Sequence, residues 1–366
     1  MRLDELDYSL PEELIAQKPL ERRDASRMLL LDRGSGKFVD SQFQRFGALL
    51  RGDELLVLNN ARVLPARLFG RRLGARAQPP SRATRREHLT GRIEVFLVRE
   101  VVADTWEALV RPGRKMPVGE CTVFGDQQQL RGEVIARGEL GLRTIRFTAA
   151  EGYTVPQLVA ELGHVPLPPY IQREDEVADR ERYQTVFATK TGAIAAPTAG
   201  LHFTTETLEA IRAKGVEIRE LTLNVGLGTF QPIHEENLEG HRMHGECYEI
   251  PTETAERITV ARKAGRPILA VGTTVVRALE NSALRALEQE TGQLVLDGRA
   301  EASIFIQPGF AFRVVEGLLT NFHLPRSTLL ALVFAFAGRE NVLAAYRHAI
   351  EERYRFYSYG DCMLIR

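Results

Sequence analysis

The segment His241-Arg-Met-His244-Gly-Glu-Cys247 gathers residue types that can bind metal or move protons. A structural zinc site needs four ligands in a closed set, and this segment lacks a second pair of cysteines, so we predict no metal here. Imidazole titrates near neutral pH, which favours a general acid or base role for His241 or His244. A purely structural role for both histidines also fits these residues.

Three further segments combine rings with proline and small residues. They are Pro166-Leu-Pro-Pro-Tyr170, Pro197-Thr198-Ala-Gly200-Leu-His202-Phe203 and Asn321-Phe-His323-Leu-Pro325. Proline fixes the backbone φ angle, and small residues permit tight turns, so these segments are expected to form rigid loops. Rings held on rigid loops suit a pocket that stacks on a planar base. The alternative is that the prolines and aromatic residues only pack the interior of the loops.

An anion site is predicted where the apolar run Ile268–Val271 meets Gly272-Thr273-Thr274 and then Arg277. This order is typical of a buried strand, a tight turn and the start of a helix. Backbone N–H groups at a helix N-terminus, together with a cation, bind anions. The simpler alternative is that Gly272 only makes the turn.

The segment Asn224-Val-Gly226-Leu-Gly228-Thr229 also follows a predicted strand and looks like the start of a dinucleotide-binding fingerprint. That fingerprint requires a third glycine where Gln231 stands, and Pro232 would open the helix poorly. The mismatch weakens one alternative, a methyltransferase or dehydrogenase on a nucleotide-binding sheet.

The elements that must position these segments follow from hydrophobic periodicity and turn residues. After about Tyr153, helix and strand patterns alternate, which is typical of an α/β domain. The patterns predict helices over 204–214, 252–264, 273–288, 327–337 and 340–353, and strands over 216–223 and 267–271. Near the N-terminus they predict a helix that begins at Ser9 and stops at Pro19, a strand over 28–32, a helix over 41–50 and a strand over 54–58.

A different pattern occupies the stretch between these α/β parts. Short strand patterns at 92–98, 105–110, 121–124, 130–136 and 142–147 alternate with Gly, Pro and Asp, which predicts a small antiparallel β-barrel. The predicted fold class is therefore α/β with two domains, a number that suits 366 residues. Both ends of the chain, 1–60 and 153–366, form the larger α/β catalytic domain, and 61–152 form the inserted barrel.

Composition restricts the class of protein further. Hydrophobic residues make up 44% and charged residues 26%, as in an ordinary globular protein. Three widely separated cysteines favour free thiols in a reducing compartment, and no run approaches the roughly 18 apolar residues of a membrane span, so a cytoplasmic protein is predicted. The net charge is zero, yet between Arg62 and Arg92 nine arginines stand against one acid, Glu87, which indicates a local site for a polyanion.

A series of longer motifs, in a fixed order, covers nearly the whole chain. They are Leu14–Gln17, Arg23–Arg27, Asn59–Leu68, Arg111–Lys115, Gly163–Ile171, Arg182–Thr185, Ala195–Thr204, Val225–Phe230, Ala270–Arg277, Thr320–Pro325 and Phe356–Asp361. In sequence and order these blocks resemble the signature of the S-adenosylmethionine:tRNA ribosyltransferase-isomerase family of queuosine biosynthesis.

This resemblance implies an α/β domain with an inserted barrel, and it implies a reaction. The ribosyl part of S-adenosylmethionine is transferred to 7-aminomethyl-7-deazaguanine at the wobble position of a tRNA with a GUN anticodon. It is isomerised there to an epoxycyclopentane, which gives epoxyqueuosine and releases adenine and methionine. S-adenosylmethionine is then a consumed co-substrate, no other cofactor and no metal are expected, and the expected enzyme is a cytoplasmic monomer.

The implied chemistry gives each candidate residue a role. A sulfonium acidifies the neighbouring C5′ hydrogens, so the reaction needs a base, an acid for departing adenine and exclusion of water. The candidates for proton transfer are His202, His241, His244 and His323. The candidates for substrate binding are Tyr170, Thr198, Gly200, Phe203, Gly226, Gly228, Thr229, Gly272, Thr273, Thr274, Arg277 and Asn321. The candidates for RNA phosphate binding are Arg62, Arg67, Arg111, Arg114 and Lys115.

Three positions depart from the family pattern. Asn224 stands where the family usually has histidine, Cys247 stands where an aromatic residue is common, and the arginine-rich loop 74–88 is longer than usual. No catalytic role is therefore assigned to position 224. Two other classes of function stay open on the residues alone: a non-catalytic tRNA-binding protein and a methyltransferase that uses the same donor.

Overall fold

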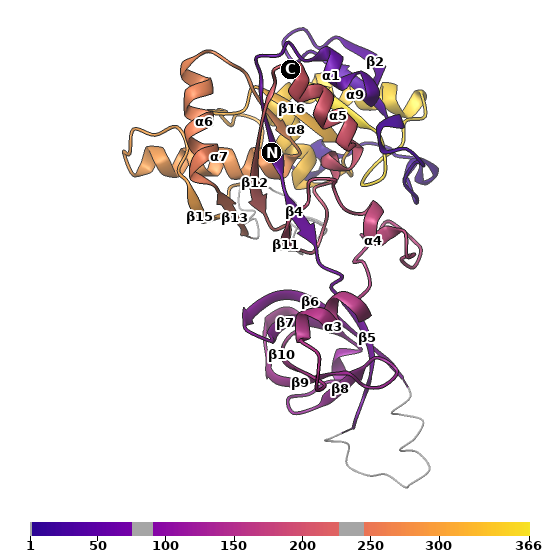
Figure 1. Ribbon diagram of the computed structural model, residues 1–366. Helices are drawn as coiled ribbons and strands as arrows, with labels where there is room; N and C mark the ends of the chain where they lie inside the picture. The colour runs from indigo at the N-terminus through magenta and orange to yellow at the C-terminus, as the bar shows by residue number, and fades with distance from the viewer. Residues whose placement is uncertain (1, 75–90, 227–244) are drawn as a thin grey trace. The chain divides into compact units, whose positions relative to one another are not determined.

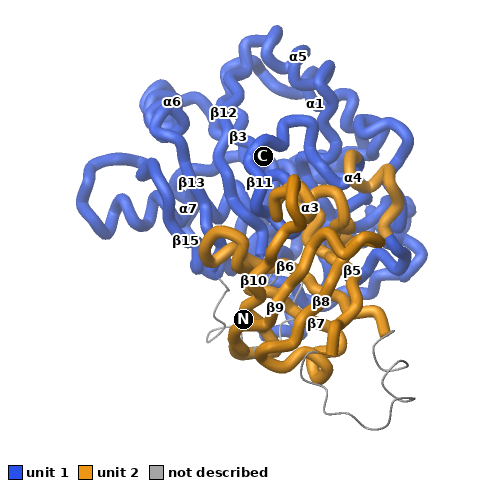
Figure 2. Tube along the Cα trace, turned by 60° about the horizontal axis from the view of Figure 1, so that its bottom comes forward, with its two compact units in different colours: residues 1–62, 168–174, 182–366 blue, residues 63–167, 175–181 orange. Residues whose placement is uncertain are grey.

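The computed structural model of the chain describes residues 2–74, 91–226 and 245–366. The chain divides into two compact units, which Figure 2 colours separately. The first unit comprises residues 1–62, 168–174 and 182–366, and the second comprises residues 63–167 and 175–181. Both ends of the chain lie in the first unit, and the second is an insertion, as the sequence predicts for the fold class (Figure 1).

The first unit is built on a nine-stranded mixed sheet with the order β15-β13-β12-β3-β14-β16-β17-β1-β2. Its strands are β1 (Arg27–Leu31), β2 (Phe38–Gln42), β3 (Leu55–Asn59), β12 (Glu217–Leu223), β13 (Glu246–Ile250), β14 (Ile268–Val271), β15 (Gly298–Ala302), β16 (Gly317–Asn321) and β17 (Cys362–Ile365). Strands β12, β3, β14 and β16 are parallel to one another, and β17 runs antiparallel to β16. The centre of the sheet is therefore parallel.

Helices cover both faces of this sheet because its central strands are apolar on both sides. All five residues of β3 are buried. Leu55 and Val57 belong to the core under α6 (Thr252–Lys263), α7 (Thr273–Glu288), α8 (Thr328–Ala337) and α9 (Arg339–Glu351). Leu56 and Leu58 belong to the core under η4 (Phe43–Arg45), α1 (Phe46–Leu49), η7 (Thr198–His202) and α5 (Thr205–Ala213). Continuous apolar runs of this kind are typical of parallel strands between two helical layers.

The prediction of a helix that begins at Ser9 is wrong. The structure has only a 3₁₀ turn, η2 (Glu12–Leu14), between η1 (Leu3–Leu6) and η3 (Arg23–Ala25). Ile15 forms an isolated parallel bridge with Phe356, and the N–H of Ala16 donates to the carbonyl of Phe356. This pairing with a distant segment outweighs the capping signal, because it satisfies backbone groups that a helix would have used locally.

The helix predicted over 41–50 is also largely wrong. Residues 38–42 form β2, which pairs antiparallel with β1, and only η4 and the four-residue α1 follow. Phe43 and Phe46 are fully buried and stack with ring centroids 5.3 Å apart. Two rings three residues apart fit a short turn as well as a helix, so the pattern did not distinguish them.

The second unit contains a closed six-stranded antiparallel barrel, β10-β7-β6-β5-β8-β9, as predicted. The strands are β5 (Arg67–Arg72), β6 (Arg92–Val102), β7 (Thr105–Arg111), β8 (Cys121–Phe124), β9 (Leu130–Arg137) and β10 (Leu142–Ala149). A Cβ at Gly70 would lie 2.5 Å from the carbonyl of Val123, so this crowded strand position requires glycine. The smaller elements are β4 (Ala61–Val63), η5 (Gly113–Lys115), η6 (Glu139–Gly141), α3 (Val155–Leu162), α4 (Asp179–Arg182) and β11 (Lys190–Ala193).

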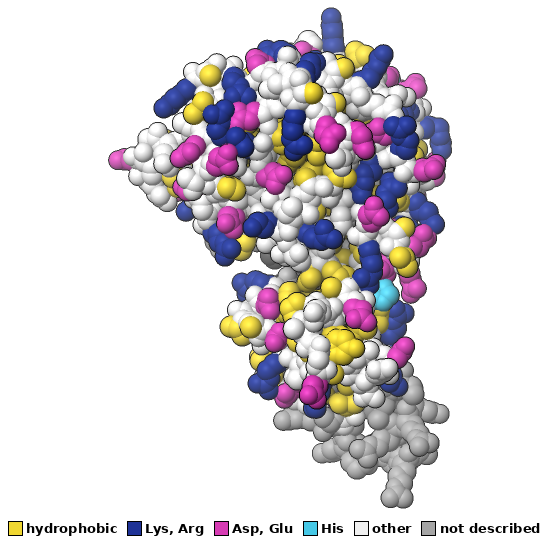
Figure 3. Space-filling model, in the orientation of Figure 1, with side chains coloured by type: hydrophobic (Ala, Val, Ile, Leu, Met, Phe, Trp, Pro, Cys, Tyr) yellow, Lys and Arg dark blue, Asp and Glu magenta, His cyan; other side chains and the backbone are white. Residues whose placement is uncertain are grey.

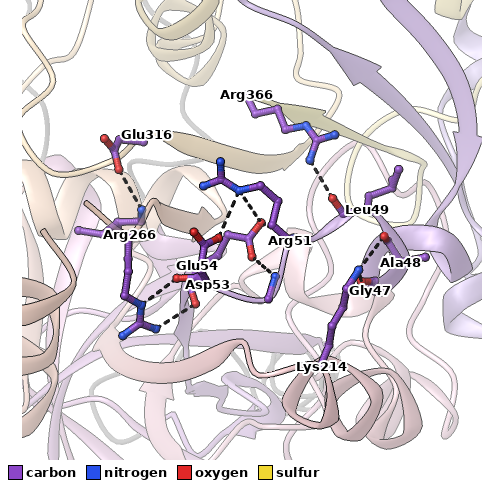
Figure 4. A network of polar contacts seen from close by, with 12 residues as sticks. Gly47, Ala48, Leu49, Arg51, Asp53, Glu54, Lys214, Arg266, Glu316 and Arg366 are labelled. Atoms are coloured by element: carbon purple, nitrogen blue, oxygen red, sulfur yellow. Dashed lines mark hydrogen bonds and ion pairs between the residues drawn. The ribbon is translucent and has the colours of Figure 1, made fainter. Parts of the chain in front are cut away.

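The amino ends of the central strands are closed by ion pairs and backbone contacts (Figure 4). Arg266, just before β14, donates to the carbonyl of Asp53 over 2.8 Å and to Glu217 over 3.0 Å. The hydrogen bond from Arg257, assisted by Arg266, lowers the pKa of Glu217 to about 2. The carboxylate of Glu54 accepts the N–H of Arg51 at 2.7 Å. The charged side chains at this edge of the sheet are therefore occupied in contacts within the protein. A ligand site is expected at the opposite edge, where the carboxyl ends of the parallel strands lie.

Among the described residues, no single helix is both long enough and apolar enough to span a bilayer. The pair α8 and α9 meets both criteria jointly, with a bend of 114° between the two helices.

Candidate active site

A pocket of about 90 Å³ opens at the carboxyl ends of the parallel strands. Residues that follow β12, β14 and β16 line it, together with the turn before β17, whose antiparallel direction brings its start to the same edge. The lining comprises Tyr170, Ala195–Ala199, Val225, Gly272–Thr274, Thr320–Leu324, Ser327, Leu329, Tyr357 and Ser358. Open α/β sheets bind ligands at this edge. The tertiary structure thus brings the three predicted rigid loops and the predicted anion turn to one place.

The N-terminus of α7 forms one wall of the pocket. Gly272 precedes the helix with a φ of +92°, a conformation that favours glycine, and its N–H donates to the carbonyl of Leu319. Thr273 and Thr274 begin the helix and line the pocket. The first N–H groups of a helix have no acceptor within the helix, so this wall offers hydrogen-bond donors to an anion.

Arg277, predicted to act with this turn, does not line the pocket. Its guanidinium forms a buried ion pair with Glu246 and donates to the carbonyl of Ala302 at 2.9 Å. The side chains of Arg277 and Glu246 are 4% and 5% exposed. The charge of Arg277 is thus neutralised inside the protein, and it joins the first turn of α7 to β13 and β15.

His323 lines the pocket. Its Nε2 lies 2.8 Å from the hydroxyl of Thr320, and its main chain is held by the hydroxyls of Tyr346 and Tyr8. No described residue is a hydrogen-bond partner of Nδ1. Burial lowers the pKa of His323 to about 3. A neutral imidazole has one nitrogen whose lone pair can accept a proton.

His202 lies behind the pocket wall and does not line it. Its Nδ1 is 2.8 Å from the hydroxyl of Ser26, and its Nε2 is 3.0 Å from Oδ1 of Asn321. Burial lowers the pKa of His202 to about 4, although the hydrogen bond with Asn321 opposes the change. Both ring nitrogens therefore have partners inside the protein.

The two buried histidines predict a specific acid sensitivity. An unfolded chain binds protons on these rings below about pH 6.5, whereas the folded chain keeps them neutral to about pH 4 and pH 3. Stability should therefore fall as the pH falls through this window, by about 1.4 kcal/mol per pH unit for each histidine. Urea unfolding of the wild type and of His202→Gln at several pH values checks this. The difference between the two chains should shrink by that slope from pH 6 to 4.5, and parallel curves would contradict it.

The aromatic candidates separate into a pocket residue and a core residue. Tyr170 lines the pocket, its ring centroid 4.6 Å from that of Tyr357, and burial raises its pKa to about 12. Phe203 is fully buried and packs against Phe43 and Phe46. The ring of Phe203 therefore belongs to the core and does not line the pocket.

The small residues predicted to bind substrate also divide. Thr198 lines the pocket, whereas a Cβ at Gly200 would lie 2.7 Å from Thr185, so that glycine permits close packing behind the wall. Gly226 is described but does not line the pocket. Gly228, Thr229, His241 and His244 lie outside the described residues. Within the described residues no group of three or more His, Cys, Asp or Glu side chains is placed to hold a metal ion.

The motif Phe356–Asp361 contains pocket residues that were not predicted from the sequence. Tyr357 and Ser358 line the pocket, and Tyr357 has a φ of +71°, which is strained for a residue other than glycine. The hydroxyl of Ser358 lies 2.7 Å from that of Tyr170. Backbone strain cannot be read from residue types, but the tyrosine and serine beside a glycine in this motif were an available signal.

The basic candidates differ in their exposure and in their ion pairs. Arg62, Arg111, Arg114 and Lys115 are exposed, whereas Nε of Arg67 lies 3.1 Å from a carboxylate oxygen of Glu94. Arg62 belongs to the first compact unit and the others to the second. On the face of the first unit drawn in Figure 3, basic and acidic side chains are interspersed, in keeping with zero net charge.

Comparison with known proteins identifies the family. A model of the family described as "Queuosine biosynthesis protein" matches residues 3–365. S-adenosylmethionine:tRNA ribosyltransferase-isomerases of Solibacter usitatus and Halothermothrix orenii are 52% and 46% identical, and each match covers 100% of both chains. The crystal structure of S-adenosylmethionine tRNA ribosyltransferase from Thermotoga maritima is similar, with a TM-score of 0.52 and 35% identity over 99% of this chain and 100% of that one. The chain therefore belongs to the S-adenosylmethionine:tRNA ribosyltransferase-isomerase family of queuosine biosynthesis proteins.

Proposed function

We propose that this enzyme transfers and isomerises the ribosyl moiety of S-adenosylmethionine onto 7-aminomethyl-7-deazaguanine at the wobble position of tRNA. The products are epoxyqueuosine in the RNA, adenine and methionine. Family membership supports the reaction class. The observation that carries the assignment of the site is the pocket at the carboxyl edge of the sheet, where neutral His323 and the N-terminus of α7 meet.

His323 is the proposed base. If Nε2–H donates to the hydroxyl of Thr320, the lone pair of Nδ1 can take a C5′ proton beside the sulfonium. The C5′ carbanion breaks the C4′–O4′ bond, and the oxyanion released on C1′ becomes an aldehyde as adenine leaves with a proton. The RNA amine then adds to C4′ of the vinyl sulfonium and loses a proton, which restores the carbanion at C5′. That carbon attacks the C1′ aldehyde to close the ring, and the resulting alkoxide displaces methionine from C5′ to form the epoxide. The low pKa of His323 keeps the ring unprotonated at neutral pH but also makes it a weak base, so the bound substrate must raise this pKa for efficient proton transfer.

The other walls suit the remaining parts of the substrates. The N–H groups at the start of α7 and the hydroxyls of Thr273 and Thr274 would hold the methionine carboxylate. The ring of Tyr170, paired with Tyr357, offers a surface for a planar base. Both proposals use only residues that line the pocket.

Product identification tests this function against its alternatives. The purified enzyme is incubated with S-adenosylmethionine and tRNA that carries the deazaguanine, in the presence of a chelator. Release of adenine and methionine supports ribosyl transfer without a metal. S-adenosylhomocysteine would instead indicate a methyltransferase, and no small product would indicate a tRNA-binding protein. Activity that is lost on chelation and restored by zinc would return His241, His244 and Cys247 to a metal site.

We further propose that exposed Arg62, Arg111, Arg114 and Lys115 contact tRNA phosphates. Neutralising any one should weaken tRNA binding and reduce the magnitude of the logarithmic salt slope by about 0.7 to 0.9 per lost contact. Arg67 should change the slope less, because Glu94 already balances its charge. Binding titrations over a range of salt concentrations measure the slope. If none of these variants changes it, RNA recognition lies elsewhere in the protein.

A further inference from the structure

A continuous line of buried hydrogen bonds joins the N-terminal segment to the turn that lines the pocket. It runs from the hydroxyl of Ser26 through the ring of His202 to the side-chain amide of Asn321, and on to the carbonyls of Tyr357 and Ser358. Ser26, His202 and Asn321 are 4%, 3% and 2% exposed. Their hydrogen bonds are therefore shielded from water, where an unmade one is costly.

The acceptors in this line fix where each proton lies. The side-chain nitrogen of Asn321 is 2.8 Å from the carbonyl of Tyr357, and a carbonyl can only accept, so the amide NH₂ must face it. Oδ1 of Asn321 then faces His202, 3.0 Å away, and it too can only accept. His202 must therefore carry its proton on Nε2.

The same reasoning removes His202 from proton transfer. A neutral ring with Nε2–H has its only lone pair on Nδ1, 2.8 Å from the hydroxyl of Ser26. That hydroxyl has a single proton and a second acceptor within reach, the carbonyl of Arg23 at 3.1 Å, and it can donate to the nearer Nδ1. Burial, with the nearby guanidinium groups of Arg355 and Arg23, disfavours a second proton on the ring. Neither nitrogen is then open to a substrate.

Asn321 is the residue through which His202 reaches the site. Its amide holds the carbonyl of Tyr357, whose backbone has a φ of +71°, and Tyr357 and Ser358 both line the pocket. Such a strained turn persists only when its surroundings fix it. This turn places the ring of Tyr357 against the ring of Tyr170, and it places the hydroxyl of Ser358 within hydrogen-bond distance of the hydroxyl of Tyr170.

We propose that His202 is a positioning residue: its Nε2–H orients the amide of Asn321, which holds the Tyr357–Ser358 turn in the shape that the pocket requires. This role rests on the proposed function, because the pocket must bind S-adenosylmethionine and the RNA base for the turn to matter. It differs from the proposed role of His323, which lines the pocket itself.

A pair of variants separates positioning from proton transfer. In His202→Gln the amide nitrogen can occupy the place of Nε2 and donate to Asn321, whereas neither amide group of His202→Asn reaches that far. We expect His202→Gln to keep single-turnover adenine release within about threefold of the wild type, and His202→Asn to lower it by about 10- to 100-fold. Equal and large losses in both variants, with wild-type melting temperatures, would assign proton transfer to His202 and overturn the proposal.

A measurement on the intact wild-type chain guards against variants that fail to fold. In protein labelled with ¹⁵N-histidine, the ring resonances of His202, assigned by their absence in the variants, should report a neutral ring with Nε2 protonated at pH 7. A ring protonated on Nδ1, or on both nitrogens, would overturn the proposal. If the wild type releases no adenine, the proposed function fails, and the tautomer still decides whether His202 holds Asn321 in this way.

Discussion

Replacing His323 with asparagine should lower single-turnover adenine release by a factor of about 10² to 10⁴, the usual contribution of a positioned proton-transfer group. His323 lines the pocket, and burial lowers its pKa to about 3, so the ring stays unprotonated throughout the neutral range. Asparagine cannot accept the proton, and its shorter side chain also loses the hydrogen bond between Nε2 and Thr320, so the melting temperature of the variant must be measured as well. Rapid-quench measurement of adenine, with tRNA and S-adenosylmethionine both saturating, reports the chemical step.

The matched control for this variant is His348→Asn. His348 lies on α9 and pairs with Asp40, its Nε2 2.9 Å from the carboxylate, and it does not line the pocket. Adenine release by this variant should match the wild type. If His323→Asn retains nearly full turnover, or loses it only in step with its melting temperature, His323 is structural and the search for a base passes to His241 and His244.

The low pKa of His323 also fixes the direction of its pH effect. Because the pKa is lowered, acidification from pH 7 to pH 5 should not protonate this base, and it should cause no loss of rate through this group. A group with the ordinary histidine pKa would lose most of its unprotonated form over the same range. The pH dependence of the single-turnover rate therefore distinguishes a buried base from an exposed one.

Breaking the buried ion pair between Arg277 and Glu246 should strongly destabilise the first unit. Neither side chain is more than 5% exposed, and removing one member leaves an uncompensated buried charge. Glu246→Leu should therefore lower the free energy of unfolding by about 3 to 5 kcal/mol. Urea unfolding measured by fluorescence or circular dichroism reports the change.

The double variant Glu246→Leu with Arg277→Met provides the test of mechanism. Replacing a whole buried pair by apolar residues of similar volume is often neutral or stabilising, so the double variant should recover most of the loss. If it is as unstable as Glu246→Leu alone, the loss came from packing around β13 and the charge interaction contributes little. If Glu246→Leu is as stable as the wild type, the pair is open to water in solution.

Elements with strong local patterns could be predicted from the residues alone. The apolar run at Ile268–Val271 and the amphipathic repeat of 273–288 predicted β14 and α7 nearly to the residue, because buried strands and helices have different hydrophobic periods. Alternation of short strands with turn residues likewise predicted the inserted barrel. The ordered motifs predicted the family, because their residues and their order resemble the family signature along nearly the whole chain.

Which of the predicted residues meet depends on contacts between distant parts of the chain. His202 and His323 occupy similar positions in their loops. Yet the ring of His202, in η7, contacts Asn321, whereas His323, which follows β16, lines the pocket. Arg277 sits at the predicted anion turn, but a strand far along the chain supplies Glu246 to neutralise it. Likewise, the N-terminal segment is extended because Phe356 pairs with it. In each case a partner distant in sequence outweighs the local signal, because burial makes an unpaired charge or backbone group costly.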